Sequence, residues 1–371
     1  MRLCLLTNDY PPMEGGISAY TKGLCQGFDA LGHQCDVFFF PVNAMSLIDE
    51  QSVTTLPVKG RWTFSRYLSA KKALNQVRDR LLSADLLIVS SWSPLGAACK
   101  ALLKETKPRS VLLAYGNDVL EPMRSKRQTK RMKEVFEYFD LLAAISRYTA
   151  SLCQRVTKRE VTVIGGGLDR KFTQNKVKAE ADGRDRAFAF LSVGRLIERK
   201  GCGLVIESLS RIRHLLSNWR YIIIGNGPYE SELRDLALKH NLAEHVQIRT
   251  HVGIDELLKW YRVSDVFVMV SREIPEKGEV EGLGLVYMEA GGASLPVIAG
   301  RTGGVADVVE EGVNGLLVDP ISAEEISNAL LELYRDRSLR ERLGGEGRRL
   351  AEKEWKWEKV AQAIIDTAMK S

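Results

Sequence analysis

The chain of 371 residues lacks several features that would assign it to a common class of protein. Its six cysteines are scattered without a C-x-x-C pair, which predicts reduced thiols and neither a disulfide framework nor a zinc site. No apolar run approaches the ~18 residues that a membrane-spanning helix needs. The start of the chain, MRLCLLTNDY, has the pattern of a short strand and a turn, unlike a signal peptide. We therefore expect a cytoplasmic protein.

Signatures of several catalytic chemistries are also missing. Neither half contains a complete G-x-G-x-x-G with an acidic residue ~20 positions later, which argues against an NAD-dependent enzyme. Only five histidines occur, and only His251 falls in a loop where we expect ligands, which disfavours a nucleotide-sugar epimerase. The chain has no D-x-D motif and no obvious nucleophile and base pair. We therefore expect no metal and no cofactor.

What is present is the composition of a globular protein, with 45% hydrophobic and 27% charged residues. The length favours two domains. The net charge of +6 is mild, and it indicates an anionic partner without distinguishing nucleic acid, membrane or phosphate.

Short β-rich runs alternate with helix-length segments, a pattern typical of an α/β fold with buried parallel strands. The pattern occurs twice, and a glycine-rich, then charged stretch at 165–186 separates the two series. We predict two doubly wound, Rossmann-like domains at 1–172 and 186–355, with ligands bound in the deep cleft between them. The expected strands are 2–7, 35–40, 86–90, 110–116, 141–146 and 161–165, then 187–194, 220–227, 246–249, 266–271, 295–300 and 315–319.

Two turns in the second half carry chemistry. SVGRLIERKG (192–201) places Arg195 and Lys200 after a strand, and a planar guanidinium with a point cation suits a pyrophosphate. The alternative is a charged, solvated loop. After the next strand, Gly225-x-Gly227 lacks the third glycine of a dinucleotide fingerprint, which favours a tight strand-to-helix turn.

The stretch EGLGLVYMEA (281–290) holds two glutamates eight positions apart. We predict that Gly282, Leu283 and Gly284 begin a helix running to about residue 292, with Glu281 in the preceding loop. The unpaired N–H groups of a first helical turn form an anion site, and glycines let a phosphate approach. Helix capping alone would explain Glu281 but not Glu289, which is placed to accept hydrogen bonds from hydroxyls such as those of a ribose.

These motifs resemble retaining nucleotide-sugar glycosyltransferases of family 4, whose architecture is GT-B. The resemblance rests on NDYPPMEGGISAY, VGRLIERKG and the E-x7-E of Glu281 and Glu289. It extends to VTVIGGGLD, SDVFVMVSRE and PVIAGRTGGVADVVEEGVNGLLVDP, covers most of the chain and is strongest from 190 to 320.

The resemblance implies that Glu281 faces the donor sugar at the reaction centre and that Glu289 holds the ribose. Arg195 and Lys200 would stabilise the charge that develops on the pyrophosphate. Retention would follow from same-face attack, with the leaving phosphate taking the acceptor proton. Further donor contacts are expected from Gly15, Gly16, Gly194, Gly225, Val252, Gly282, Leu283 and Gly284.

One position departs from the family pattern. Members often carry a histidine within the segment written here as AYGNDVL (114–120), where this chain has Tyr115. Tyrosine can donate a hydrogen bond but does not titrate near neutrality. Tyr115 is therefore one candidate for the contact to the sugar, and the alternative is that Asn117 or Asp118 supplies it.

Two segments of the first half bear on the acceptor. RSKRQTKRMK (124–133) has six basic residues and no acid, and 60–72 mixes basic and aromatic residues. Such surfaces dock on anionic lipid headgroups, and the alternative is a solvated basic face over apolar core residues. The amphipathic C-terminal helix, 356–371, is expected to cross back to the N-terminal, acceptor-binding domain, as is common in this architecture.

The resemblance thus implies a retaining hexosyltransferase that uses a GDP- or UDP-sugar in its C-terminal domain. The acceptor would be a hydroxyl of a lipid, a lipid-linked glycan or a polysaccharide precursor. We expect no nucleic-acid partner, and a cytoplasmic enzyme that associates peripherally with the inner face of the membrane. A non-catalytic sensor that binds a nucleotide sugar is the main alternative.

Overall fold

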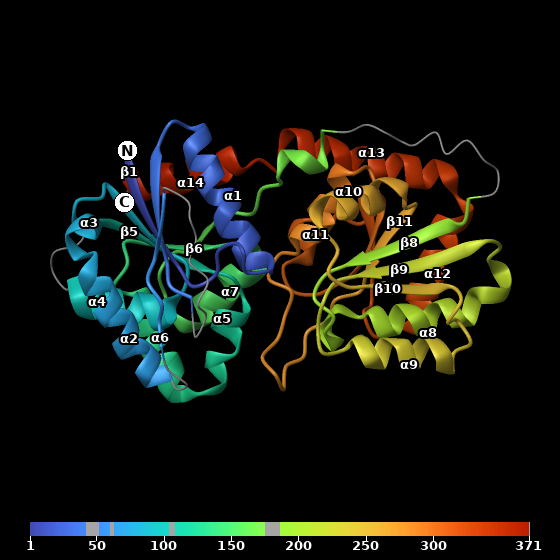
Figure 1. Cartoon of the computed structure of the whole chain (residues 1–371), viewed down its shortest axis with the longest axis horizontal. Helices are drawn as coiled ribbons and strands as arrows, with labels where there is room; N and C mark the ends of the chain where they lie inside the picture. The colour runs from blue at the N-terminus through green and yellow to red at the C-terminus, as the bar shows by residue number, and fades with distance from the viewer. Residues whose placement is uncertain (42–51, 60–62, 104–107, 175–185, 371) are drawn as a thin grey trace. The chain divides into compact units, whose positions relative to one another are not determined.

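The computed structural model describes residues 1–41, 52–59, 63–103, 108–174 and 186–370 (Figure 1). The chain divides into a first unit, Met1–Gly167 with Lys356–Ser371, and a second unit, Leu168–Trp355. The predicted boundary at 172 therefore differs from the observed one. Residues 168–172 belong to the second unit because Phe172 meets the ring of Tyr261 edge-on at 5.6 Å between centroids. Residues 175–185 of the stretch predicted to separate the two series lie outside the described residues.

The first unit contains a fully parallel sheet in the order β3-β2-β1-β4-β5-β6-β7. In register, Leu3 of β1 lies opposite Cys35 of β2 on one side and Leu86 of β4 on the other. Strands β1, β2 and β4 are almost entirely buried, as expected for a parallel sheet covered on both faces. The strands are β1 (Arg2–Thr7), β2 (Gln34–Phe39), β3 (Val53–Thr55), β4 (Leu86–Val89), β5 (Arg109–Ala114), β6 (Leu141–Ala144) and β7 (Thr162–Val163).

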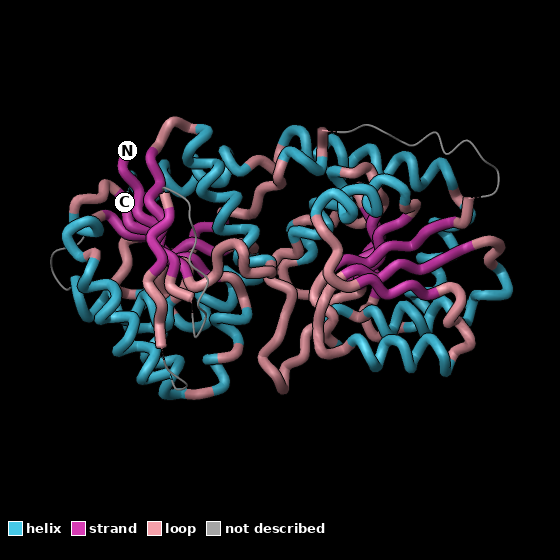
Figure 2. The backbone as a smooth tube through the Cα atoms, viewed as in Figure 1, coloured by secondary structure: helices cyan, strands magenta, loops and turns pink. Residues whose placement is uncertain are grey.

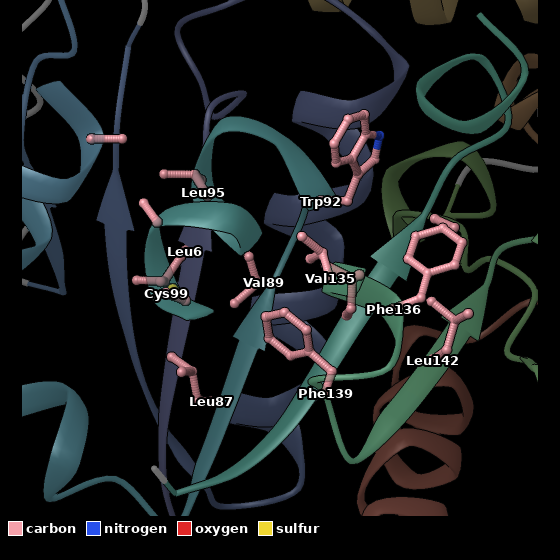
Figure 3. Close-up of a cluster of buried hydrophobic side chains, with 14 of the residues drawn as sticks. Leu6, Leu87, Val89, Trp92, Leu95, Cys99, Val135, Phe136, Phe139 and Leu142 are labelled. Carbon is pink, nitrogen blue, oxygen red and sulfur yellow. The ribbon is translucent and has the colours of Figure 1, made fainter. Parts of the chain in front are cut away.

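Helices α2 (Thr63–Gln76), α4 (Ala97–Leu103) and α6 (Lys126–Phe136) pack into one hydrophobic core over a face of this sheet. Figure 3 shows Val135, Phe136 and Phe139 turned toward side chains of the strands. The apolar residues of α6 are thus core, as one of the two alternatives for this segment predicted. Other helical segments of the unit are α3 (Arg78–Leu82), η1 (Trp92–Gly96), α5 (Asn117–Leu120) and η2 (Pro122–Arg124).

Helix α14 (Trp357–Lys370) belongs to the first unit, where it packs against α1 (Gly16–Ala30) and near β5 and β6. The indole of Trp357 lies so close to Gly23 and Gly167 that a Cβ at either would come within 2.5 Å of it. Glycine is therefore required at both positions for this helix to dock. Helix α7 (Arg147–Val156) completes the unit.

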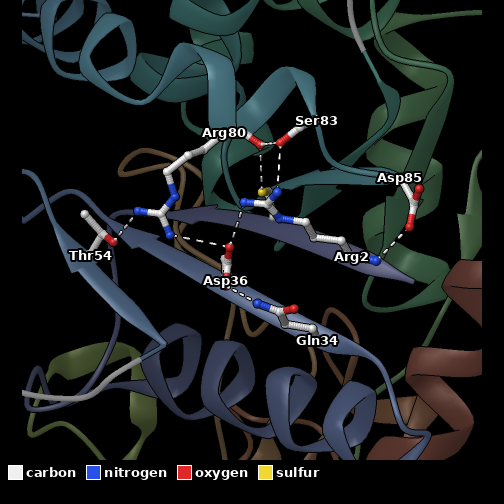
Figure 4. Close-up of polar contacts among 8 residues, drawn as sticks. Arg2, Gln34, Asp36, Thr54, Arg80, Ser83 and Asp85 are labelled. Atoms are coloured by element: carbon white, nitrogen blue, oxygen red, sulfur yellow. Dashed lines mark hydrogen bonds and ion pairs between the residues drawn. The ribbon is translucent and has the colours of Figure 1, made fainter.

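A polar network joins the amino ends of three strands in the first unit (Figure 4). The Asp36 carboxylate pairs with Arg2 at 3.5 Å and with Arg80 at 3.4 Å, and accepts a hydrogen bond from Gln34 at 3.2 Å. The backbone N–H of Arg2 donates to Asp85 at 2.7 Å, which ties β1 to the residue preceding β4. These contacts fix the strands at the end of the sheet opposite to where ligands bind in such folds.

The second unit contains a parallel six-stranded sheet in the order β10-β9-β8-β11-β12-β13, the 3-2-1-4-5-6 order of a Rossmann fold. Its strands are β8 (Phe188–Val193), β9 (Trp219–Ile224), β10 (Val246–Arg249), β11 (Val266–Met269), β12 (Val297–Gly300) and β13 (Gly315–Val318).

Helices cover both faces of this second sheet, with α8, α9 and α12 on one face and α10, α11 and α13 on the other (Figures 1 and 2). They are α8 (Cys202–Ile212), α9 (Glu230–Lys239), α10 (Ile254–Val263), α11 (Leu285–Gly292), α12 (Ala323–Arg335) and α13 (Arg337–Lys353), with short turns η3 (Arg170–Phe172), η4 (Glu198–Lys200), η5 (Arg213–Leu215) and η6 (Val305–Asp307).

The prediction of two doubly wound α/β domains is confirmed, and all twelve expected strands occur within a few residues of their predicted positions. The sequence did not predict β3, because its three residues, Val-Thr-Thr, form no apolar run. The six cysteines are all buried and free. Among the described residues, none of the helices combines the length and apolar character needed to span a bilayer.

Candidate functional site

The candidate site lies in the second unit at the carboxyl ends of β8 and β11. These two strands are neighbours, and the strand order reverses between them, which is where doubly wound folds bind ligands. Lys200 follows β8, at the end of η4, and Glu281 follows β11 through a loop. The topology therefore brings together two predicted site residues that are 81 positions apart.

Glu281 is buried, with 8% of its surface exposed, and is held by three donors. Its Oε2 accepts hydrogen bonds from Lys200 Nζ at 2.6 Å, Arg199 Nη1 at 3.1 Å and Ser271 Oγ at 3.0 Å. All three donors converge on this one oxygen. No described residue donates to Oε1 with hydrogen-bond geometry, so that oxygen is left to accept a hydrogen bond from a ligand.

The cations determine the charge of Glu281. Burial by itself raises the pKa of this carboxyl, but the charges of Lys200 and Arg199, with hydrogen bonds from Lys200 and Ser271, outweigh burial and lower the pKa to about 2. The carboxylate is therefore ionised throughout the neutral range.

Backbone and aromatic contacts fix the position of Glu281. The Tyr287 hydroxyl donates to the Met269 carbonyl at 2.8 Å and lies 3.4 Å from Ser271 Oγ, which orients the serine toward Glu281. The Glu281 carbonyl accepts from the Gly304 N–H at 2.9 Å. At Gly303, whose φ is 52°, a Cβ would approach the same carbonyl to 2.2 Å, so glycine is required there.

The predicted start of the helix after Glu281 is wrong by a few residues. Gly282, Leu283 and Gly284 precede α11, which begins at Leu285, while the predicted end near 292 is confirmed. Gly284 adopts a left-handed conformation with φ 88°, and a Cβ there would clash with the Tyr287 ring at 2.4 Å. No side chain caps this helix with a hydrogen bond, so the first N–H groups of α11 point out of the helix unpaired by a cap.

Glu289 lies within α11 and is partly exposed. Its Oε2 accepts a hydrogen bond from the Tyr261 hydroxyl at 2.8 Å. Burial raises the pKa of this carboxyl, and the Tyr261 hydrogen bond and Lys171 counter only part of that effect. Glu281 and Glu289 thus have opposite pKa shifts, because only Glu281 is paired with two cations.

The predicted glycines after β8 and β9 bring two turns into contact. A Cβ at Gly225 would lie 1.9 Å from the Gly194 carbonyl oxygen, and φ is 151° at Gly225. The turns are also joined by hydrogen bonds from Gly194 N–H to Ile224 and from Leu196 N–H to Asn226. Lys200 passes Gly194, with its Cε in van der Waals range of the position a Cβ would occupy. The tight turn predicted for Gly225 is confirmed.

Arg195 is placed differently from its predicted partner Lys200. Its side chain is exposed and has no hydrogen bond or ion pair among the described residues, so it is available to a ligand. The cation that joins Lys200 on Glu281 is Arg199, which sequence reasoning missed. A three-residue turn has no periodicity, so the sequence could not show that Arg199 is buried.

Val252 is partly buried in the loop between β10 and α10. This loop is tied to the turn after β9, because the His251 N–H donates to the Asn226 side chain at 3.0 Å. His251 itself adopts a positive φ of 55°, which is uncommon outside glycine. The loop therefore has a defined conformation beside the carboxyl end of β9.

Gly15 and Gly16 lie in the first unit, at the start of α1. Gly15 precedes the helix with φ 146°, and no atom lies within 4 Å of a Cβ built at either glycine. The glycines thus leave open space at a helix terminus that has no side-chain cap, as a phosphate-approaching turn requires.

Tyr115 also lies in the first unit and is only 6% exposed. Its ring meets Tyr20 edge-on at 5.5 Å, and its hydroxyl has no partner with hydrogen-bond geometry among the described residues. Burial raises the pKa of the phenol far above its ordinary value, and Thr21 counters part of that shift. In this conformation the hydroxyl does not reach the surface, so its role as a sugar contact stays a prediction.

Asp118 holds the same segment in place. One of its oxygens accepts from the Tyr115 N–H at 2.8 Å, and the other is buried without a partner among the described residues. Burial raises the pKa of this carboxyl to about 6, although several backbone N–H groups lower it. Within the described ranges, no group of three or more His, Cys, Asp or Glu side chains forms a metal-binding cluster. Metal independence stays a prediction.

Comparisons with known proteins agree with this arrangement. Residues 14–172 match the family described as Glycosyltransferase Family 4, and residues 171–350 match Glycosyl transferases group 1. A GDP-mannose-dependent alpha-(1-6)-phosphatidylinositol monomannoside mannosyltransferase of Mycobacterium tuberculosis is 30% identical over 98% of this chain and 97% of its own. A Corynebacterium glutamicum enzyme, named for the monoacylated form of that acceptor, is 26% identical over 98% of this chain and 96% of its own.

Solved structures show the same fold at lower sequence identity. A sucrose-phosphate synthase of Thermosynechococcus elongatus superposes with a TM-score of 0.82 at 20% identity, covering 100% of this chain and 98% of its own. A Rickettsia africae glycosyltransferase gives 0.79 at 15% identity, covering 100% and 98%. From the two family matches and the full-length relatives, this chain is a GT-B glycosyltransferase and belongs to glycosyltransferase family 4.

Proposed function

We propose that this chain transfers a hexose from a nucleotide diphosphate sugar to an acceptor hydroxyl, with retention of the anomeric configuration and without a metal ion. The observation that carries the proposal is the Glu281 carboxylate at the switch between β8 and β11. Two cations and a serine hold it through Oε2, and Oε1 is left to face a sugar hydroxyl.

The surrounding residues supply the other functions that such a transfer needs. Lys200 and the exposed Arg195 follow β8, where they would bind the diphosphate and stabilise its charge as it leaves. The first N–H groups of α11 would bind phosphate or sugar oxygens. Glu289 would accept hydrogen bonds from the ribose, because its second oxygen is not used by Tyr261.

In the proposed reaction the bond between the sugar C1 and the phosphate oxygen breaks as the acceptor oxygen bonds to C1 on the same face. The acceptor proton passes to the leaving phosphate oxygen, and a nucleoside diphosphate is released. Positive charge develops on the sugar in the transition state, as in glycoside hydrolysis. The ionised Glu281 would stabilise that charge and orient the sugar.

GDP-mannose is the donor to test first. The relatives from Mycobacterium tuberculosis and Corynebacterium glutamicum, which match this chain over nearly its full length, are both named as GDP-mannose-dependent mannosyltransferases. At 26 to 30% identity a donor can change between relatives, so UDP-sugars belong in the same experiment.

A thermal-shift panel with GDP, UDP, ADP and NAD tests the proposal on the wild-type protein. A ligand at ~100 times its dissociation constant stabilises the native state by ~2.7 kcal/mol, which is a measurable shift. We expect stabilisation by GDP above that by the other ligands, and then release of GDP from GDP-mannose in the presence of acceptor. No shift with any nucleoside diphosphate, or a shift with NAD alone, would contradict the proposal.

We propose further that the acceptor is held at an anionic lipid surface, which the enzyme contacts through its first unit. Phe64 and Leu68, one helical turn apart on α2, are 69% and 49% exposed. Helix α6 and the residues before it pack into the same core as α2 and present six exposed basic residues: Arg124, Lys126, Arg127, Lys130, Arg131 and Lys133. Exposed apolar residues and a basic face in the same unit suit a peripheral contact with anionic lipid. Residues 60–62 of the predicted segment lie outside the described residues.

Co-sedimentation with vesicles tests this contact. The double variant Phe64→Ser, Leu68→Ser should lose binding to vesicles that contain phosphatidylinositol and keep its affinity for GDP. Ile321→Ser is the matched control, because Ile321 is a similarly exposed apolar residue, 66% exposed, in the second unit. Equal binding of wild type and double variant, or no preference for anionic over neutral vesicles, would contradict the lipid contact.

A further inference from the structure

We propose that Arg199 is a positioning residue for the transfer reaction, which keeps the Glu281 carboxylate in its reactive orientation once the donor diphosphate engages Lys200. This role rests on the proposed function. It concerns a residue that, like Lys200, donates to Glu281 Oε2 but has different surroundings.

When a donor is bound, Lys200 can pair with Glu281 or with the diphosphate. In the structure its ammonium lies 2.6 Å from Glu281 Oε2. The same ammonium is close to Gly194 at the carboxyl end of β8, where we expect the diphosphate to bind. A diphosphate carries more negative charge than one carboxylate, so it draws the lysine away from Glu281 or weakens that contact.

Arg199 is placed to remain on Glu281. Its side chain is 9% exposed, and its carbonyl accepts a hydrogen bond from the Arg272 N–H at 2.9 Å. That bond ties η4 to the loop that leads from β11 to Glu281. With its backbone held in this way, Arg199 directs its guanidinium at Oε2, where it can hold one oxygen of the carboxylate while the other contacts the sugar.

The cost of this arrangement also points to a functional role. Arg199 Nε is buried and has no hydrogen-bond partner among the described residues. A buried guanidinium with an unsatisfied N–H contributes little to stability, because the hydrogen bonds that it makes do not fully offset the free energy lost on its desolvation. What the residue provides is a second positive charge beside Glu281.

Each of the described groups that face Glu281 has a known charge. Arg199 and Lys200 of η4 are the positive charges, Ser271 after β11 donates a hydrogen bond, and Tyr287 of α11 is a neutral phenol whose pKa is raised by burial. The 303–304 turn contributes backbone contacts. If a bound diphosphate occupies Lys200, Arg199 is the remaining cation that keeps Glu281 ionised.

Kinetics of the full-length enzyme test this role. Arg199→Met, Arg199→Lys and wild type are compared by GDP release from GDP-mannose between pH 4.5 and 8. For Arg199→Met we expect kcat to fall about 10- to 100-fold at neutral pH and KM for the donor to change less than about 3-fold. Its kcat should also decline toward pH 4.5, because Glu281 with fewer cations beside it has a higher pKa than in wild type, whose profile should stay flat over this range. Arg199→Lys should recover most of the rate and the flat profile.

Arg211→Met is the matched control, because Arg211 is an exposed arginine of α8 that pairs with Glu207. It should behave as wild type. A rate and a pH profile of Arg199→Met equal to those of wild type would overturn the proposal. A loss of donor affinity as large as the loss of kcat would also overturn it, because Arg199 would then bind the donor directly.

A double-mutant cycle without any donor separates this proposal from the proposed function. The thermal destabilisation caused by Arg199→Met should be smaller in a Glu281→Gln background than in wild type. Additive effects would show that the pair is not coupled and would overturn the proposal whatever the enzyme's activity. Absence of donor turnover by wild type, with coupling intact, would instead overturn the proposed function and the role in transfer that rests on it.

Discussion

The two units build similar groups of arginine and carboxylate at opposite ends of their sheets. In the first unit Arg2 and Arg80 meet Asp36 at the amino ends of β1 and β2, and the two arginine side chains are 38% and 45% exposed (Figure 4). In the second unit Arg199 and Lys200 meet Glu281 at the carboxyl ends of β8 and β11, and their side chains are 9% and 12% exposed. The chemistry is alike, and position and burial separate the two groups.

The difference shows which ion pairs serve the fold. Arg2 and Asp36 are strand residues, so their pairing connects elements that the sheet already aligns. Glu281, Arg199 and Lys200 lie in loops and a short turn, where no ladder of backbone bonds fixes them. A buried loop carboxylate beside two cations is costly to assemble, and sites of this kind occur where ligands bind. The first group should therefore affect stability, and the second should affect activity.

The largest effect is expected at Glu281. Glu281→Ala should reduce turnover by about 1,000-fold or more, because it removes the carboxylate that we propose faces the sugar. Binding of the nucleoside diphosphate, measured by calorimetry, should stay within a few-fold of wild type. Near-normal turnover would show that the role assigned to Glu281 is wrong.

Lys200→Ala should weaken both donor binding and rate, with a combined loss in kcat/KM of about 100-fold. The reason is that Lys200 contacts Glu281 in the free enzyme, and we propose that it binds the diphosphate of the donor. Steady-state kinetics with the donor check this. An unchanged kcat/KM in this variant would contradict the binding of the diphosphate by Lys200.

Glu289→Ala should act mainly on binding, raising the dissociation constant of the donor about 10-fold or more while kcat changes little. Tyr261→Phe is the control, since it removes only the hydrogen bond to Glu289 Oε2 and leaves the carboxylate in place. A loss confined to kcat would place Glu289 at the reacting sugar and contradict a ribose contact.

Asp36→Ala tests the opposite half of the comparison. We expect the free energy of unfolding to fall by about 1 to 2 kcal/mol, because two guanidinium groups lose their partner. Denaturant unfolding measures the change, and the affinity for GDP should be the same as in wild type. A change in nucleotide affinity with intact stability would mean that the amino-end group is not purely structural.

The smallest expected effect is the dependence of stability on pH, which should have opposite directions for Asp118 in the first unit and Glu281 in the second. Glu281 has a lowered pKa, so its contribution to stability is present above about pH 4.5 and is lost as pH falls toward about 2. Asp118 has a raised pKa, so its contribution is present below about pH 4 and is lost as pH rises through about 6.

Melting curves between pH 4 and 7 isolate the effect of Asp118. Over this window wild type should lose stability relative to Asp118→Asn, by an amount on the order of 1 kcal/mol. Parallel curves for the two proteins would show that the carboxyl of Asp118 is not perturbed.

Much of the fold and part of the site could be predicted from the sequence. The β-rich runs gave the strands because buried parallel strands need continuous apolar surface, whereas the short strand β3 has none. Lys200, Glu281 and Gly225 were predicted because charge after a strand and glycine in a tight turn leave a local pattern. The two units divide after Gly167 and not at the predicted residue 172, since the packing of Phe172 on Tyr261 leaves no such pattern.

The sequence by itself determined the fold class, the repeated α/β pattern and the order of the motifs, because these depend on local apolar periodicity and on backbone requirements. Only the tertiary structure decided which cation meets which carboxylate. Arg199 rather than Arg195 lies on Glu281 because β8 and β11 are neighbours and η4 turns the side chain of Arg199 inward, whereas Arg195 precedes η4 and is exposed. Contacts between residues about 80 positions apart depend on strand order and side-chain direction, which no local pattern encodes.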